Sequence, residues 1–150
     1  MPSELERFAK WLQQQVDDDA RDAFSDTVVN EFFDPANFER LTNADAQAVF
    51  TGPCGDTMEI YLMLRDGSID HASFMTDGCG PTIACGSMLT KLATGKTIDE
   101  AAAIEPQELR DALSGLPPEN EHCADLAVIT LRRALASTGD APTEPAPTDG

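Results

Sequence analysis

The sequence predicts an α+β domain in which a three-stranded antiparallel sheet is packed with helices. Three short runs with strand character, residues 46–51, 57–65 and 68–76, follow one another with short connections, which predicts an antiparallel meander. After Gly78 the spacing of the apolar residues becomes helical. One face of so small a sheet must be covered, and the helices are the elements available to cover it.

Two helices are expected before the sheet. In residues 3–16, Ser3 and Glu6 fit a capping box, and apolar residues follow at helical spacing. A second helix, over about 25–34, begins with Ser25 as its capping residue. It ends at Asp34-Pro35, because a residue before proline disfavours the helical conformation. The apolar side of this second helix is expected to comprise Val28, Val29, Phe32 and Phe33.

Turn and cap residues divide the rest of the chain. Asp66-Gly67 is a strong signal for a hairpin between the second and third strands. Pro81 suits the first turn of a helix that Gly95 ends. Thr97 and Glu100 form another capping box, which begins a short helix. Two more helices are expected, over 105–113 and about 120–136, with 116–118 as an extended connector between them.

These elements define the expected domain organisation. Residues 1–22 carry an additional N-terminal helix, and residues 23–137 form the main domain. Residues 138–150 are polar and rich in proline, so this tail is expected to be disordered.

The charge of the chain excludes two classes of partner. The 150 residues contain 10 Lys and Arg against 27 Asp and Glu, a formal charge of −17. Nucleic-acid binding depends largely on basic residues that neutralise phosphates, so neither nucleic acid nor an anionic membrane is an expected partner. Residues 1–10 do not have the order of a secretory signal, which makes the cytoplasm the expected location.

Three of the four cysteines lie at predicted element ends beside glycine or a polar turn: Cys54, Cys79 and Cys123. Asp56 lies two residues after Cys54, so on an extended segment both would point to one face, and His122 precedes Cys123. Thiolate, carboxylate and imidazole groups are metal ligands. A joint metal site and a set of small buried side chains both remain open, because these separations differ from the short Cys-x-x-Cys pairs of zinc fingers.

Longer stretches of sequence decide between these interpretations. FMTDGCGPTIACGSMLTKLATGKTIDEA closely resembles the core of the IscU/NifU-type iron–sulfur cluster scaffold family. GPCGDTMEIYLMLRDG upstream and LPPENEHCADLAVITLRRAL downstream resemble the same family, in order and with similar gaps, over about 24–136. Long ordered matches are far more specific than a short motif.

The resemblance implies a function and a ligand set. Family members assemble a 2Fe–2S cluster from iron and persulfide sulfur, which a cysteine desulfurase supplies, and pass it to apo iron–sulfur proteins. They hold zinc in the cluster-free form and do not act as enzymes. Carried over residue by residue, the implied metal and cluster ligands are Cys54, Asp56, Cys79, His122 and Cys123, and Cys123 is also the implied sulfur acceptor. We interpret Asp56 as a weak ligand that favours release, and Cys123 as the outer member of the His–Cys pair.

Several positions depart from the family pattern. Phe24 stands where the family often has tyrosine. Glu119 and Asn120 replace an apolar and a basic residue of the segment that a dedicated Hsp70-type chaperone reads. This chain is therefore not expected to use that chaperone in the usual way. Cys85 is an extra cysteine on an apolar helix face, and we interpret it as a buried structural residue.

Two alternative functions compete with the scaffold. One is a zinc-dependent sulfur acceptor of the SufU-like branch, which typically has an insertion between the second and third ligand loops and lacks the histidine. The segment from Cys79 to Cys123 leaves no room for that insertion, and His122 is present, so both features favour the scaffold. The other alternative is a structural zinc module, which would hold zinc permanently and assemble no cluster.

Overall fold

The computed structural model describes residues 7, 24–53, 55–78 and 80–137. The expected N-terminal helix, apart from Arg7, and the expected tail lie outside the described residues, as do Cys54 and Cys79. The described elements are, in order, α2 (Asp26–Phe33), β1 (Ala46–Thr51), β2 (Thr57–Arg65), β3 (Ser68–Thr76), α3 (Gly80–Ala93), α4 (Ile98–Ala102), α5 (Pro106–Ala112), the 3₁₀ turn η1 (Pro118–Asn120) and α6 (Glu121–Ala136).

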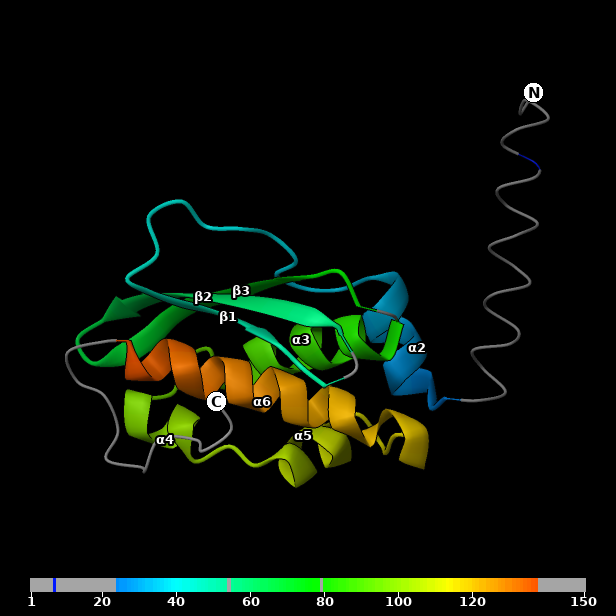
Figure 1. The fold of residues 1–150 in the computed structure, drawn as a ribbon. Helices are drawn as coiled ribbons and strands as arrows, with labels where there is room; N and C mark the ends of the chain where they lie inside the picture. The colour runs from blue at the N-terminus through cyan, green and yellow to red at the C-terminus, as the bar shows by residue number, and fades with distance from the viewer. Residues whose placement is uncertain (1–6, 8–23, 54, 79, 138–150) are drawn as a thin grey trace.

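The elements form layers, which confirms the predicted α+β fold. The strands make one antiparallel sheet in the order β1-β2-β3. Helix α6 packs under β1 and β2, α3 packs under β3, and α4 and α5 lie farther from the sheet (Figure 1). The core between the sheet and the helices contains Met58, Ile60 and Leu62 of β2, which are fully buried.

The β2–β3 hairpin has the predicted turn. Arg65 pairs with Ser68, so the connection is the two residues Asp66 and Gly67. Both have positive φ, 53° and 78°, as a type I′ turn requires. The observed strand bounds equal the predicted ones, because turn residues separate all three runs.

Helix α2 begins as predicted but presents a different face to the core. The side chain of Ser25 accepts a hydrogen bond from the backbone N–H of Val28, which confirms the cap. Phe33, which was predicted to be on the apolar side, is 36% exposed, whereas Glu31 is buried. This part of the prediction is wrong because α3 offers polar partners for a carboxylate.

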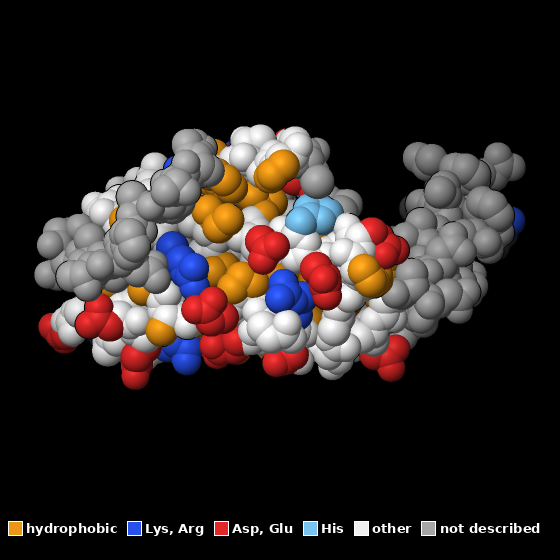
Figure 2. Space-filling model, turned by 60° about the horizontal axis from the view of Figure 1, so that its bottom comes forward, with side chains coloured by type: hydrophobic (Ala, Val, Ile, Leu, Met, Phe, Trp, Pro, Cys, Tyr) orange, Lys and Arg blue, Asp and Glu red, His pale blue; other side chains and the backbone are white. Residues whose placement is uncertain are grey.

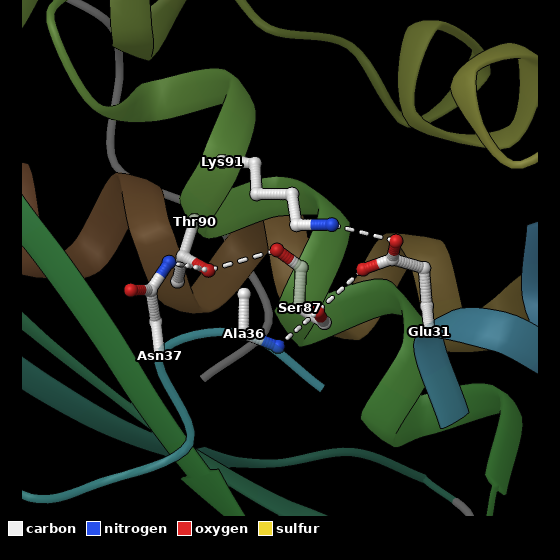
Figure 3. A network of polar contacts seen from close by, with 6 residues as sticks. All are labelled: Glu31, Ala36, Asn37, Ser87, Thr90 and Lys91. Atoms are coloured by element: carbon white, nitrogen blue, oxygen red, sulfur yellow. Dashed lines mark hydrogen bonds and ion pairs between the residues drawn. The ribbon is translucent and has the colours of Figure 1, made fainter. Parts of the chain in front are cut away.

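A buried polar network joins α2 to α3 (Figure 3). Glu31 accepts hydrogen bonds from Lys91 Nζ at 2.6 Å and Ser87 Oγ at 2.5 Å. Ser87 Oγ in turn accepts one from the backbone N–H of Ala36 at 2.8 Å. A buried charge is tolerated when it is paired and hydrogen-bonded, and these contacts hold α2 against the helix that follows Cys79.

The two edges of the sheet differ. At β3, the Phe74 N–H donates to the Asn37 carbonyl at 2.9 Å, and the rings of Phe38 and Phe74 stack with centroids 5.0 Å apart. The chain from α2 then crosses the face of the sheet opposite α3 and α6 to reach β1 (Figure 1). Strand β1 pairs with β2 alone among the described residues, and its Val49 is 58% exposed.

The C-terminal helices agree with the prediction except at one connector. The Thr97–Glu100 capping box is present at α4. Pro118 was expected to be extended, but it begins the 3₁₀ turn η1, which leads directly into α6. Helix α6 therefore starts after Asn120, whose side chain makes no capping hydrogen bond. No helix in the described part of the chain is long and apolar enough to cross a membrane.

An ion pair on the outer face of the sheet makes a testable contribution to stability. Arg40 donates to Glu59 through Nε at 2.9 Å and Nη2 at 3.0 Å, and the Tyr61 hydroxyl donates to the same carboxylate. The hydrogen bond from Arg40 lowers the pKa of Glu59 below its ordinary value of 4.5. Burial and the Glu59 carboxylate raise the pKa of Tyr61.

A Glu59→Gln variant should lose about 1 kcal/mol of unfolding free energy at pH 7, since a charge-assisted pair is replaced by a neutral one with an exposed arginine. Because the folded-state pKa of Glu59 is lowered, its contribution is present above pH 4.5 and is lost as pH falls through the folded-state value. Denaturant unfolding at pH 7 and at pH values below 4.5 measures the difference. Asp70→Asn, at an exposed position of β3, is the control. A difference that does not shrink in acid would contradict this account.

Candidate functional site

Backbone hydrogen bonds join the two ends of the β1–β2 connection at one end of the sheet. The Gly52 N–H donates to the Asp56 carbonyl at 2.9 Å, and the Gly55 N–H donates to the Gly52 carbonyl at 3.0 Å. Gly55 has φ +89°, a conformation that L side chains rarely adopt. Cys54 belongs to this loop by sequence and lies outside the described residues.

The loop between β3 and α3 begins at the same end of the sheet. Asp77 Oδ1 accepts a hydrogen bond from the Thr57 N–H at 2.9 Å, and Thr76 Oγ1 accepts one from the Gly78 N–H at 3.0 Å. Thr57 directly follows Asp56, so the two loops start side by side. Cys79 follows Gly78 in sequence and also lies outside the described residues.

The glycines on either side of Cys79 allow close packing. A Cβ on Gly78 would lie 2.9 Å from the Thr82 side chain, and a Cβ on Gly80 would lie 3.1 Å from the Phe32 ring. Real Cβ atoms essentially never approach to less than 3.0 Å. Glycine at position 78 therefore brings the chain entering α3 directly against Thr82.

The His122–Cys123 pair is arranged opposite to the prediction. Cys123 is fully buried, whereas His122 is partly exposed, with its Nε2 3.8 Å from Cys123 Sγ. The expectation that Cys123 is the outer member is therefore wrong. Cys123 belongs to the apolar stripe of α6, with Ala124 and Ala127, and this stripe docks on the sheet.

Thr82 links two of the predicted ligands. Its Oγ1 lies 3.3 Å from Asp56 Oδ2 and 3.3 Å from Cys123 Sγ. The carboxylate comes from the β1–β2 loop, the sulfur from α6 and the hydroxyl from α3, so three elements meet here. Thr82 is not among the residues predicted from the sequence, although its position three residues after Cys79 is a signal that could have found it.

The structure places the remaining site residues as follows. Asp56 and Cys123 both lie beside Thr82 Oγ1, and His122 lies beside Cys123 Sγ. Within residues 24–53, 55–78 and 80–137, no three His, Cys, Asp or Glu side chains are grouped so that they could hold a metal ion. A complete predicted ligand set would need Cys54 and Cys79. Cys85 is fully buried in the core, as expected for a structural cysteine.

A cavity of about 260 Å³ opens beside His122 and Asp56, between β1 and α6. Its walls include the apolar side chains of Phe50, Leu126 and Ile129. Figure 2 shows apolar side chains gathered next to a histidine on the helical side of the molecule, with basic side chains scattered among acidic ones. The charged groups at this end thus lie at the border of an apolar opening, where the local dielectric is lower than in water.

Sequence comparison decides the family. The model of the NifU-like N terminal domain matches residues 23–141, which include all three converging segments. The chain belongs to the NifU-like N-terminal domain family. An iron–sulfur cluster assembly scaffold protein, IscU 1, of Archaeoglobus fulgidus is 42% identical over 113 residues, which cover 75% of this chain and 74% of the relative. The corresponding protein of Escherichia coli K12, IscU, is 35% identical over 119 residues, covering 76% and 92%.

A solved structure supports the NifU-like fold. A candidate iron–sulfur cluster assembly scaffold protein for the SUF system from Fervidobacterium islandicum matches with a TM-score of 0.61, covering 74% of this chain and 95% of that one. At 18% sequence identity this likeness concerns the fold alone. In this NifU-like chain, the fold places the two loops and the start of α6 at one end of the sheet.

Proposed function

We propose that this NifU-like chain is a scaffold on which a 2Fe–2S cluster is assembled from iron and desulfurase-derived sulfur and then passed to apo-proteins. The observation that carries the proposal is the meeting of Asp56 and Cys123 at Thr82 Oγ1, each at 3.3 Å. The relatives that are 42% and 35% identical are named as iron–sulfur cluster assembly scaffolds. Their likeness extends over three quarters of this chain.

The proposed ligands are Cys54, Asp56, Cys79, His122 and Cys123. Thiolate sulfur is the soft donor that iron–sulfur clusters require. A carboxylate or imidazole in place of a fourth thiolate holds a cluster less firmly, which suits a protein that must release its cargo. The same donor types bind zinc, so we propose zinc as the occupant in the cluster-free form.

Cys123 is the proposed sulfur acceptor. Its thiolate attacks the outer sulfur of the desulfurase persulfide. A bond forms between Cys123 Sγ and that sulfur, the donor's S–S bond breaks, and the donor cysteine leaves as a thiolate. Because Cys123 is fully buried, its sulfur must first become accessible. The first turn of α6 follows Asn120, which gives it no side-chain cap, so we propose that the helix opens there.

The proposal also covers location and partners. A scaffold has no turnover of its own, so we propose that this chain is not an enzyme. Reactive thiolates need a reducing compartment, which favours the cytoplasm. The partners that the chemistry requires are a cysteine desulfurase and apo iron–sulfur acceptors. Glu119 and Asn120 lie on η1, directly before α6, and we propose that they make an Hsp70-type chaperone a poor partner.

Anaerobic reconstitution tests the scaffold function. The protein is supplied with cysteine, ferrous iron and a cysteine desulfurase, and bound iron and acid-labile sulfide are quantified with the visible spectrum. We expect equal amounts of iron and sulfide, lost in Cys54→Ala and in Cys79→Ala. If the protein retains zinc and binds no sulfide, the scaffold function is wrong, and a zinc-dependent sulfur acceptor or a structural zinc module takes its place.

An Asp56→Ala variant should keep its cluster longer, with transfer to an apo-ferredoxin slowed on the order of tenfold, or ~1.4 kcal/mol in the barrier. The reason is that the variant lacks the weak oxygen ligand that can be exchanged first. The decay of the scaffold's visible spectrum during transfer gives the rate. Asp125→Ala is the matched control, since Asp125 lines the same cavity but forms an ion pair with Arg110 at 3.7 Å. Equal or faster transfer from the Asp56 variant would refute the release role.

A further inference from the structure

We infer that Thr82 is a positioning residue: its hydroxyl holds the Asp56 carboxylate and the Cys123 sulfur together before a metal ion or cluster arrives. The inference deepens the proposed function and rests on it for the nature of the cargo. The metal-binding step that it describes can nevertheless be measured without any cluster.

The geometry places one hydroxyl between two groups from different elements. Thr82 is fully buried, and its Oγ1 is 3.3 Å from both Asp56 Oδ2 and Cys123 Sγ. A hydroxyl has one hydrogen and two lone pairs, so it can donate to one of these groups and accept from the other. Thr82 therefore ties the β1–β2 loop to the first turn of α6 through α3.

The surroundings of Thr82 keep its hydroxyl in place. A β-branched side chain has few χ1 rotamers in a helix. The backbone at Gly78 is so near that a Cβ there would lie 2.9 Å from Thr82 Cβ. The helix and the chain that enters it thus restrict the conformations open to the Thr82 side chain.

Fixed orientation matters because ligand groups that are already aligned need less ordering when a metal binds. Hydrogen-bond partners behind metal ligands typically change metal affinity 10- to 100-fold when they are removed. Without the hydroxyl, Asp56 stays on a glycine-containing loop with more conformations to lose. Loss of the hydroxyl should consequently weaken metal binding while it leaves the protein folded.

The test compares Thr82→Val with Thr82→Ser in the full chain. Valine keeps the branched shape and removes the hydroxyl, whereas serine keeps the hydroxyl and removes a methyl group. Zn²⁺ affinity is measured by competition with a chromophoric chelator, and Co²⁺ absorption reports thiolate coordination. We expect about tenfold weaker Zn²⁺ binding and a changed Co²⁺ spectrum in Thr82→Val, with recovery of both in Thr82→Ser.

Thr130→Val is the matched control. Thr130 is also fully buried, but its hydroxyl donates to the Leu126 carbonyl of its own helix at 2.7 Å. This variant should bind Zn²⁺ with unchanged affinity even if its melting temperature falls. Thermal unfolding of all three metal-free variants separates a folding defect from a binding defect.

The outcomes separate this inference from the proposed function. Wild-type affinity in Thr82→Val, or equal weakening in Thr82→Ser and Thr82→Val, would overturn the positioning role and leave the scaffold function intact. Weaker Zn²⁺ binding in Thr82→Val alone would support the role. It would do so even if reconstitution of the wild-type protein gave no sulfide, which would overturn only the scaffold function.

Discussion

A Cys123→Ser variant should form no persulfide at position 123 when a desulfurase supplies sulfur. The hydroxyl of serine is not a nucleophile for a persulfide at neutral pH, whereas a thiolate is. Serine can still hydrogen-bond to Thr82, whose Oγ1 is 3.3 Å from the present sulfur, so the fold should survive. Mass spectrometry of alkylated peptides after a single turnover of the desulfurase measures the transferred sulfur at each cysteine.

Cys85→Ala is the control for this experiment. Cys85 is as deeply buried as Cys123, but it belongs to the core of α3. If burial alone prevented sulfur transfer, neither thiol would react. We expect the Cys85 variant to accept as much sulfur as the wild type. If the Cys123→Ser variant accepts as much sulfur as the wild type and carries it on another cysteine, that cysteine is the acceptor and Cys123 is not.

A Gly86→Ala variant should be less stable by about 2 kcal/mol. The added Cβ would lie 2.3 Å from the Phe74 ring, which is fully buried and stacked on Phe38. Overpacking of this kind costs about 3 kcal/mol, and the better helix propensity of alanine returns up to about 1 kcal/mol. Denaturant unfolding followed by circular dichroism measures the change.

A double variant makes this stability prediction specific. Phe74→Leu removes the ring that the new Cβ would meet, so Gly86→Ala should be much less harmful in that background. The coupling between two residues in contact is typically 0.5–3 kcal/mol. Additive effects of the two substitutions would mean that the close approach of α3 to β3 at Gly86 does not limit stability.

Local signals in the sequence account for the strands and most helix ends. Asp66-Gly67 has the two positive φ values that its turn type needs, and the residues flanking it set the register of the hairpin. Ser25 and the Thr97–Glu100 pair satisfy backbone donors within their own segments. Such features depend on neighbours along the chain, and for that reason they can be predicted without the tertiary structure.

Side-chain direction at the borders of helices could not be predicted in the same way. Glu31 is buried and Phe33 is exposed, the reverse of what their polarity suggests, because Ser87 and Lys91 of α3 lie opposite Glu31. Cys123 points inward because it belongs to the apolar stripe that α6 docks on the sheet. Both outcomes depend on which element packs opposite, information that periodicity does not contain.

The candidate site was partly predictable. Asp56, His122 and Cys123 do lie close together, which the resemblance implied and residue spacing alone left open. Thr82 was missed because a threonine within an apolar helix looks like an ordinary core residue. Its role becomes visible only when the β1–β2 loop and α6 approach it from two sides.

The unequal edges of the sheet limit how two copies of this protein can associate. Among the described residues, Asn37 and Phe38 occupy the β3 edge and nothing pairs with the outer edge of β1, so β1 is the edge along which a second copy would continue the sheet. Two β1 strands related by a two-fold axis would run antiparallel in a six-stranded sheet. Each β1 rises over roughly 20 Å, so the two site-bearing ends would point in opposite directions. A cluster shared between two copies would therefore require end-to-end contact instead of edge-to-edge pairing.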